Sequence, residues 1–138
     1  MRFIIDMEPI ACSRPKVTKY GTYYTKRYRD FKKALEPKLA HLDEMRFVVL
    51  LFIVKRPKAM KKGDQVLHTK RPDLDNFIKA ILDGLPQEDS RIHTIFSQKR
   101  YAKYGEEPKI VLIGGSGIAQ CIMSFFDLLS CYLWRVSK

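Results

Sequence analysis

The spacing of hydrophobic residues along the chain predicts strands that alternate with helices. A short strand is expected from Arg2, and residues 46–55 form a long β-rich run that is almost entirely apolar. Such a run is typical of a strand that is covered on both faces. Residues 91–103 and 109–113 predict two further strands, because a turn with Gly105 and Pro108 separates them.

Two segments between these strands have helical periodicity. Apolar residues at positions 28, 31, 35, 39 and 42 predict a first helix, and those at 74, 77, 78, 81, 82 and 85 predict a second. Gly84 and Pro86 act as stop signals for the second helix. The order of elements predicts an α+β fold, of the α/β-sandwich type, in which helices pack on a mixed β-sheet. At 138 residues the chain has room for one domain with a real core, which excludes a two-domain enzyme.

The second helix begins next to a cluster of charged residues. Residues 70–75 read Lys-Arg-Pro-Asp-Leu-Asp. Pro72 pushes Arg71 out of the helical region, so the chain is expected to enter extended, with Asp73 and Asp75 pointing the same way. Two converging carboxylates between cationic side chains could build a metal site that handles phosphate.

Simpler structural roles account for part of this cluster. Asp75 is a good helix N-cap, and Lys79 with Asp83 could be an ordinary solvated ion pair. Neither role explains Asp73, a second acid that is not needed to start the helix. A nucleotide-sugar site of the Asp-any-Asp kind also remains open.

A hard cation such as Mg²⁺ takes several oxygen ligands, and further acids, Glu88 and Asp89, follow the helix together with Ser90. With them, the run from Arg71 to Asp83 resembles the signature of the RusA family of Holliday-junction resolvases, small Mg²⁺-dependent DNA endonucleases often carried by prophages. The resemblance covers roughly residues 1–113. The family's two motif aspartates, its motif lysine and its third acid fall on Asp73, Asp75, Lys79 and Asp89.

The resemblance implies an endonuclease that resolves Holliday junctions and related branched DNA in recombination and repair. Asp73, Asp75 and Asp89 would hold Mg²⁺, and Lys79 would stabilise charge on the phosphate in the transition state. A homodimer is implied, because a two-fold protein matches a two-fold junction. No small-molecule cofactor is expected.

One departure from the family pattern concerns the third acid. Only Pro86 and Gln87 separate Leu85 from Glu88, whereas family members normally have several more residues there. Each lost residue removes up to about 3.5 Å of reach. The alternative function is therefore a DNA-binding module with a broken metal site, and Glu88 could replace Asp89 as the ligand.

The distribution of charge is consistent with a DNA partner. Residues 1–72 carry 18 Lys and Arg against 7 acids, which accounts for the whole net charge of +11. Such asymmetry suits a face that neutralises phosphates. Residues 13–18 are expected to form a basic loop. Four tyrosines lie among the cations of residues 14–33, and their rings could stack on bases or pack beneath this loop. The candidate DNA-binding residues are Arg14, Lys16, Lys19, Lys70 and Arg71.

Residues 114–138 form a Gly-rich break and an apolar tail of uncertain role, after an endonuclease domain at 1–113. The stretch 118–134 is short for a membrane span, and Asp127 would lie near its centre, so a buried or dimer-interface helix is favoured over an anchor. Three widely spaced cysteines and the lack of a signal peptide predict a cytoplasmic protein. His68 lies five residues before Asp73 and could contact a substrate phosphate, but a lone histidine more often has a structural role.

Overall fold

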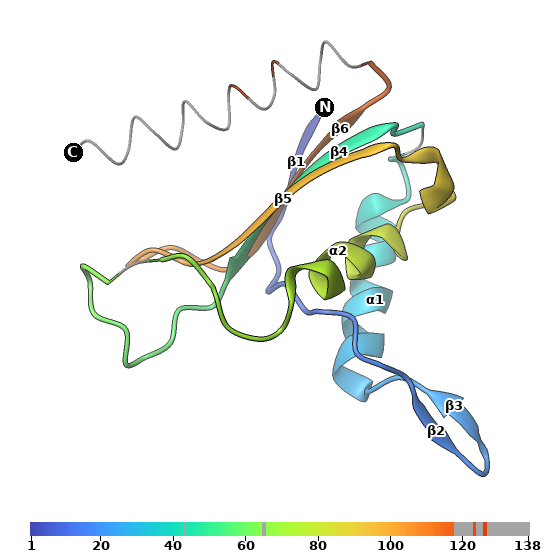
Figure 1. Cartoon of the computed structure of the whole chain (residues 1–138), viewed down its shortest axis with the longest axis horizontal. Coiled ribbons are helices and arrows are strands. Elements are labelled where there is room, and N and C mark those ends of the chain that lie inside the picture. Colours follow the sequence, from blue (N-terminus) through green and yellow to red (C-terminus); the bar gives the residue numbers. More distant parts are fainter. Residues whose placement is uncertain (43, 65, 118–122, 124–125, 127–138) are drawn as a thin grey trace.

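The computed structural model describes residues 1–42, 44–64, 66–117, 123 and 126 of the chain. It contains a four-stranded sheet, two α-helices on one face of that sheet, and a two-stranded hairpin that projects away from both (Figure 1). The sheet strands are β1 (Arg2–Ile5), β4 (Phe47–Val54), β5 (Thr94–Tyr101) and β6 (Lys109–Gly115). The helices are α1 (Lys26–Leu39) and α2 (Leu74–Leu82), and a 3₁₀ turn, η1, spans Asp89–Arg91.

The sheet is mixed, with the strand order β1-β6-β4-β5. β4 pairs parallel with β5 and antiparallel with β6, and β1 pairs antiparallel with β6. Parallel neighbours need a crossover connection, and α2 lies within the connection from β4 to β5. The predicted α+β fold with helices on a mixed sheet is confirmed.

β4 is buried on both faces, as its apolar run predicts. Val48, Leu50 and Phe52 belong to the core between the sheet and the helices, whereas the alternate residues Val49, Leu51 and Ile53 belong to a second buried cluster. Because side chains alternate across a strand, these two clusters lie on opposite faces of the sheet. A polar residue at either set of positions would be costly to bury.

α1 starts two residues before the predicted position. Thr25 is its N-cap, and the Thr25 hydroxyl accepts a hydrogen bond from the Tyr28 amide, which satisfies one free donor of the first turn. The helix ends at Leu39 rather than at residue 42, although Leu42 is also buried. The predicted apolar stripe is therefore correct and the predicted ends are shifted.

α2 packs on the sheet through Phe77, Ala80 and Ile81, which are buried. The ring of Phe77 lies 5.3 Å from that of Phe52 on β4, between ring centroids. Gly84, after the helix, packs closely against α1, since a Cβ at this position would lie only 3.2–3.3 Å from two leucine side chains of α1. These contacts fix the position of α2 and of the acids at its start.

The sequence suggested a plain basic loop after Ser13, but the structure differs. The segment forms a hairpin of β2 (Lys16–Thr18) and β3 (Gly21–Tyr23), with Lys19 and Tyr20 as its two-residue turn. Gly21 has φ +128°, which favours glycine. The sequence signal for this hairpin was a glycine between two short segments of β-forming residues, Val17-Thr18 and Thr22-Tyr23.

The apolar tail at 118–134 lies outside the described residues except for Met123 and Phe126, so its predicted role is not tested. β6 itself continues through Gly114 and Gly115, two residues beyond the predicted strand. None of the helices in the described part of the chain has the length and apolar character needed to cross a membrane.

A buried ion pair closes the turn between β5 and β6. Arg100 donates to both carboxylate oxygens of Glu106, at 2.7 and 2.9 Å. Burial raises the pKa of Glu106, but hydrogen bonds from Arg100 and from the Lys103 amide, together with the charges of Arg100 and Lys109, outweigh it and lower the pKa to about 2.

This ion pair predicts acid sensitivity. A depressed carboxylate pKa contributes stability above the ordinary pKa of 4.5, and this stability is lost as the pH falls towards 2. Glu106→Gln should therefore lower the free energy of unfolding at pH 7 and flatten its pH dependence between 4.5 and 2. Urea titrations across this range measure the effect. The neighbouring exposed Glu107→Gln is the control, and equal pH profiles for the two variants would contradict the prediction.

Candidate functional site

The acid pair lies at the amino end of α2. Asp73 is the N-cap residue, with extended backbone at φ −71° and ψ 153°, and Asp75 lies in the first turn. The suggestion that Asp75 is the N-cap is therefore wrong, because the helix begins at Leu74. The expectation that Asp73 and Asp75 point the same way rested on extended backbone at both residues, and it fails because only Asp73 is extended while Asp75 is helical.

Neither carboxylate is used up by the fold. The Asp73 side chain makes no capping hydrogen bond, and Asp75 accepts only a weak bond of 3.4 Å from the side chain of the neighbouring Asn76. Both residues are exposed. Mg²⁺ is commonly held by one or two carboxylates, with waters and substrate phosphates as the remaining ligands. This donor set fits such a cation.

Lys99 on β5 holds the segment that leads into the acid pair. Its ammonium donates to the carbonyl oxygens of Lys70 and Pro72, at 2.7 and 2.5 Å. The Arg71–Pro72 peptide bond between them is cis. Sequence analysis missed Lys99, because a lysine in a strand of mixed character gives no sign of a partner 27 residues away.

His68 has a structural place near this segment. It is buried, its ring lies 4.5 Å from that of Tyr101, and its amide donates to the Lys99 carbonyl at 3.5 Å. Burial lowers the pKa of His68, and the charges of Lys99 and Lys70 lower it further, so the imidazole is neutral at pH 7. Its burial and its packing on Tyr101 agree with a structural role.

The basic N-terminal segment is tied to the same turn of α2. The Cys12 amide donates to the Asn76 carbonyl at 2.8 Å, one residue after Asp75. Arg14 and Lys16 follow within four residues and are exposed. The structure therefore ties the root of the basic segment, which leads into Arg14 and Lys16, to the first turn of α2, and Lys70 and Arg71 come just before the acid pair along the chain.

Lys79 lies one turn after Asp75 on α2 and is exposed. Residues four apart share a helix face, so its ammonium is on the side of the acid pair. Asp83 is the C-cap, and no ion pair joins it to Lys79 in the described structure. The suggested surface pair between the two is not formed.

Asp89 lies in a separate place, in η1 beyond the carboxyl end of α2. Two hydrogen bonds of 2.7 Å between the Gln87 side chain and the Met45 backbone hold this short connection against the start of β4. The Glu88 carboxylate accepts a weak hydrogen bond of 3.4 Å from the Ser90 hydroxyl. The Asp89 side chain makes no hydrogen bond or ion pair with another described residue, and only its backbone carbonyl is used, by the Ile92 amide at 2.9 Å.

The structure does not bring the three predicted acids together within one chain. α2 has nine residues, so it separates Asp73 from the η1 connection by roughly 13 Å of helix. Within the described ranges, no group of three or more His, Cys, Asp or Glu side chains is placed to hold a metal ion. The acids thus form a pair at one end of the helix and a single carboxylate beyond the other.

A family model for the endodeoxyribonuclease RusA matches residues 6–112. The chain belongs to the RusA family. This match confirms the resemblance drawn from residues 71–90, and it contains all the candidate site residues named above. Comparison with curated proteins and with solved structures gave no significant match.

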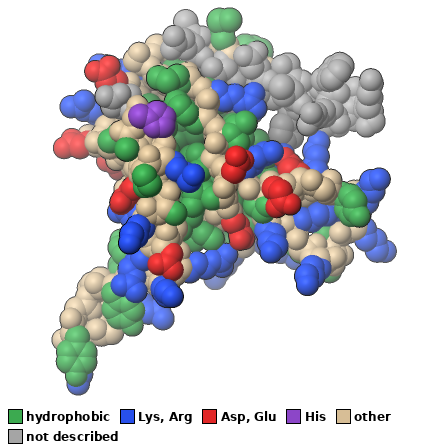
Figure 2. Space-filling model, turned by 180° about the vertical axis from the view of Figure 1, so that it is seen from behind, with side chains coloured by type: hydrophobic (Ala, Val, Ile, Leu, Met, Phe, Trp, Pro, Cys, Tyr) green, Lys and Arg blue, Asp and Glu red, His purple; other side chains and the backbone are tan. Residues whose placement is uncertain are grey.

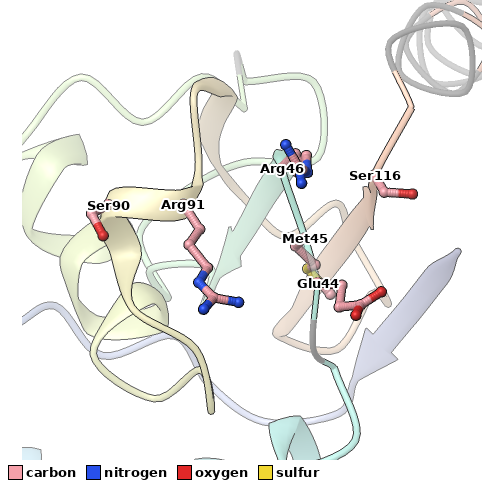
Figure 3. Close-up of a pocket in the computed structure, with 6 residues that line it drawn as sticks. All are labelled: Glu44, Met45, Arg46, Ser90, Arg91 and Ser116. Carbon is pink, nitrogen blue, oxygen red and sulfur yellow. The ribbon is translucent and has the colours of Figure 1, made fainter.

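In this RusA-family chain a cavity of about 430 Å³ lies beside η1. Ser90 and Arg91 line it from one side, and residues at the start of β4 and the end of β6 line it from the other (Figure 3). These are Glu44, Met45, Arg46 and Ser116. Arg46 and Arg91 make no ion pair with other described residues, so the cavity places two available cations near Asp89.

Replacing Lys99 by methionine tests the clamp on the segment before Asp73. Loss of two hydrogen bonds from a charged but partly exposed donor should cost about 1 kcal/mol of local stability, and so speed amide exchange at residues 68–71 roughly fivefold. Hydrogen–deuterium exchange read by mass spectrometry measures this, with β4 amides as an internal reference. Lys103→Met is the matched control, and unchanged exchange in Lys99→Met would disprove the clamp.

Proposed function

We propose that this protein is a Mg²⁺-dependent endonuclease that cuts branched DNA and resolves four-way junctions. The observation that supports this most is the exposed pair Asp73 and Asp75, free of structural hydrogen bonds other than the weak one from Asn76, in a chain of the RusA endodeoxyribonuclease family. Lys70 and Arg71 precede this pair along the chain, and the root of the basic segment that carries Arg14 and Lys16 is bonded to the same turn of α2. Such a setting suits a phosphodiester with its negative charge.

Asp73 and Asp75 would hold the cation. Bound Mg²⁺ would supply a Lewis acid for the scissile phosphate and a more acidic water. Lys79, one turn along the helix, is positioned to stabilise charge that develops on the phosphate oxygens. Arg14, Lys16, Lys70 and Arg71 would fix the register of the DNA backbone without reading its sequence.

Asp89 enters this proposal through a second subunit. Since α2 separates Asp89 from the acid pair within one chain, we assign the third carboxylate to the partner in a homodimer. A two-fold dimer would then carry two equivalent centres, as two symmetric cuts in a junction require. Asp89 is assigned this role because it is the residue on which the third acid of the family motif falls, and Glu88 stays the alternative that the variants below test.

The acid pair is tested by Asp73→Asn and Asp75→Asn. Each change removes a negative ligand, so junction cleavage in Mg²⁺ should be lost, while binding should persist or become tighter through weaker repulsion of phosphate. Cleavage of a synthetic four-way junction and gel-shift affinity measure the two effects. Asp83→Asn, at the other end of the same helix, is the matched control and should cut normally. Wild-type cutting rates in either pair variant would refute the assignment.

The shared centre is tested by mixing inactive variants. Asp89→Asn should abolish cleavage, and Glu88→Gln should have little effect. If the centre is shared, a mixture of Asp73→Asn with Asp89→Asn regains activity, because each mixed dimer contains one intact centre. No recovery after subunit exchange, verified by mass spectrometry of mixed dimers, would place all three acids in one chain or remove Asp89 from the centre.

The second candidate is a DNA-binding module that does not cut, and the lack of a three-acid cluster in the described residues favours it. Mg²⁺-dependent nicking of the four-way junction separates the two functions. A nucleotide-sugar transferase would instead bind a sugar nucleotide and show little salt-sensitive DNA binding.

A further inference from the structure

The hairpin β2–β3 projects from the body of the protein (Figure 1), and Figure 2 shows hydrophobic and basic side chains along it. All six of its strand residues are exposed. Val17 is 79% exposed, Tyr20 at the turn 87%, and Tyr23 47%. We refer to residues 16–23 as the arm. Large apolar side chains on a projecting hairpin are a common sign of a partner surface.

The arm is shaped by local bonds and not by the core. The Thr18 hydroxyl donates to the Gly21 carbonyl at 3.0 Å and accepts from the Tyr20 amide at 3.3 Å, which closes the turn. At the base, the hydroxyls of Ser13 and Thr25 lie 3.3 Å apart. A free two-stranded hairpin is only marginally stable in water. The arm therefore adds little to folding.

The structure divides the four tyrosines of the basic segment into two groups. Tyr28 is buried and Tyr24 is half-buried, and their rings pack 5.2 Å apart at the start of α1. Tyr20 and Tyr23 lie on the arm and pack against no core cluster. Packing therefore accounts for Tyr24 and Tyr28, whereas the exposed rings of Tyr20 and Tyr23 are available for stacking on a base.

Charge indicates the kind of partner. Residues 9–29 contain six Lys and Arg and no Asp or Glu, and the whole chain carries +11. An arm whose charged residues are all cationic attracts a polyanion. The Lys19 ammonium lies 4.8 Å from the Tyr20 ring centroid, over one face of the ring. The other face remains for a flat partner.

We propose that the arm recognises the branch point of the DNA, where Tyr20 stacks on a base that the branch exposes and Lys16 and Lys19 contact the adjacent phosphates. This rests on the proposed function. Bases inside a duplex are covered by their neighbours, but bases at a branch present an open face on which an aromatic ring stacks favourably. The arm thereby distinguishes branched DNA from duplex.

The root of the arm is fixed relative to the cleavage centre. Cys12 bonds to the first turn of α2, and about six extended residues from Ser13 to Lys19 span roughly 20 Å. The tip of the arm is therefore displaced from the acid pair. It contacts a part of the DNA other than the phosphate that is cut.

The experiment compares Tyr20→Ala with Tyr20→Phe, which keeps the ring. Tyr104→Ala is the matched control, because Tyr104 is also exposed and has Lys62 over its ring. A four-way junction carrying 2-aminopurine at the branch reports stacking through fluorescence. The affinity of each protein for this junction is compared with its affinity for a duplex of equal length, and both are measured without divalent metal.

Wild type, Tyr20→Phe and Tyr104→Ala should change the fluorescence and prefer the junction. Tyr20→Ala should lose the fluorescence change and bind the junction on the order of tenfold more weakly, with unchanged duplex affinity. Its slope of log affinity against log salt should also stay the same, whereas Lys19→Ala should lower that slope by about one unit.

Two results would overturn the inference while the cleavage proposal stands. The first is an unchanged fluorescence response and junction preference in Tyr20→Ala. The second is a change of Tyr20→Ala from dimer to monomer, measured by light scattering, which would make the arm a contact between copies. Failure of the proposed function gives a different result, in the wild-type protein. It appears as the absence of DNA binding or cutting by the wild-type protein, which overturns the arm inference only if the junction is not bound.

Discussion

The packing of α2 against β4 is the contact on which the rest of the structure depends. Phe77 meets Phe52 at the side of the sheet where both helices lie, and the crossover through α2 allows β5 to pair parallel with β4. An apolar contact of this kind is non-directional, but two aromatic rings in a close-packed core permit few arrangements. The amino end of α2, which carries the acid pair, is thereby set against the C-terminal half of β5.

Three segments that are distant in sequence meet at that helix end. Lys99 holds the carbonyls before Asp73, Cys12 bonds to Asn76, and His68 packs on Tyr101 behind them. The bonds are made by the protein backbone or by Lys99, so they leave both carboxylates and the surrounding cations exposed. The fold thus positions acids and bases together without neutralising them against each other.

The two ends of α2 have different surroundings. At one end an acid pair follows Lys70 and Arg71, and at the other Gln87 fixes the short connection that carries Asp89 and leads into Ser90 and Arg91, which line the cavity. The arm, the acid pair and the carboxylate beyond the helix therefore occupy separate surfaces. A small protein that acts on a large branched polyanion can use all three only when the DNA, or a second subunit, spans them.

Much of this protein was determined by the sequence itself. The unbroken apolar run of β4, the apolar stripes of both helices and the run from Arg71 to Ser90 are local patterns, and they predicted the α+β fold and the RusA family correctly. Only the tertiary structure decided that Lys99 holds the segment before Asp73, and that Asp89 does not join the acid pair within the described part of one chain. It also decided which tyrosines are buried. The physical reason is that periodicity records which face of an element avoids water, whereas these features depend on contacts between residues far apart in the chain, which no local pattern contains.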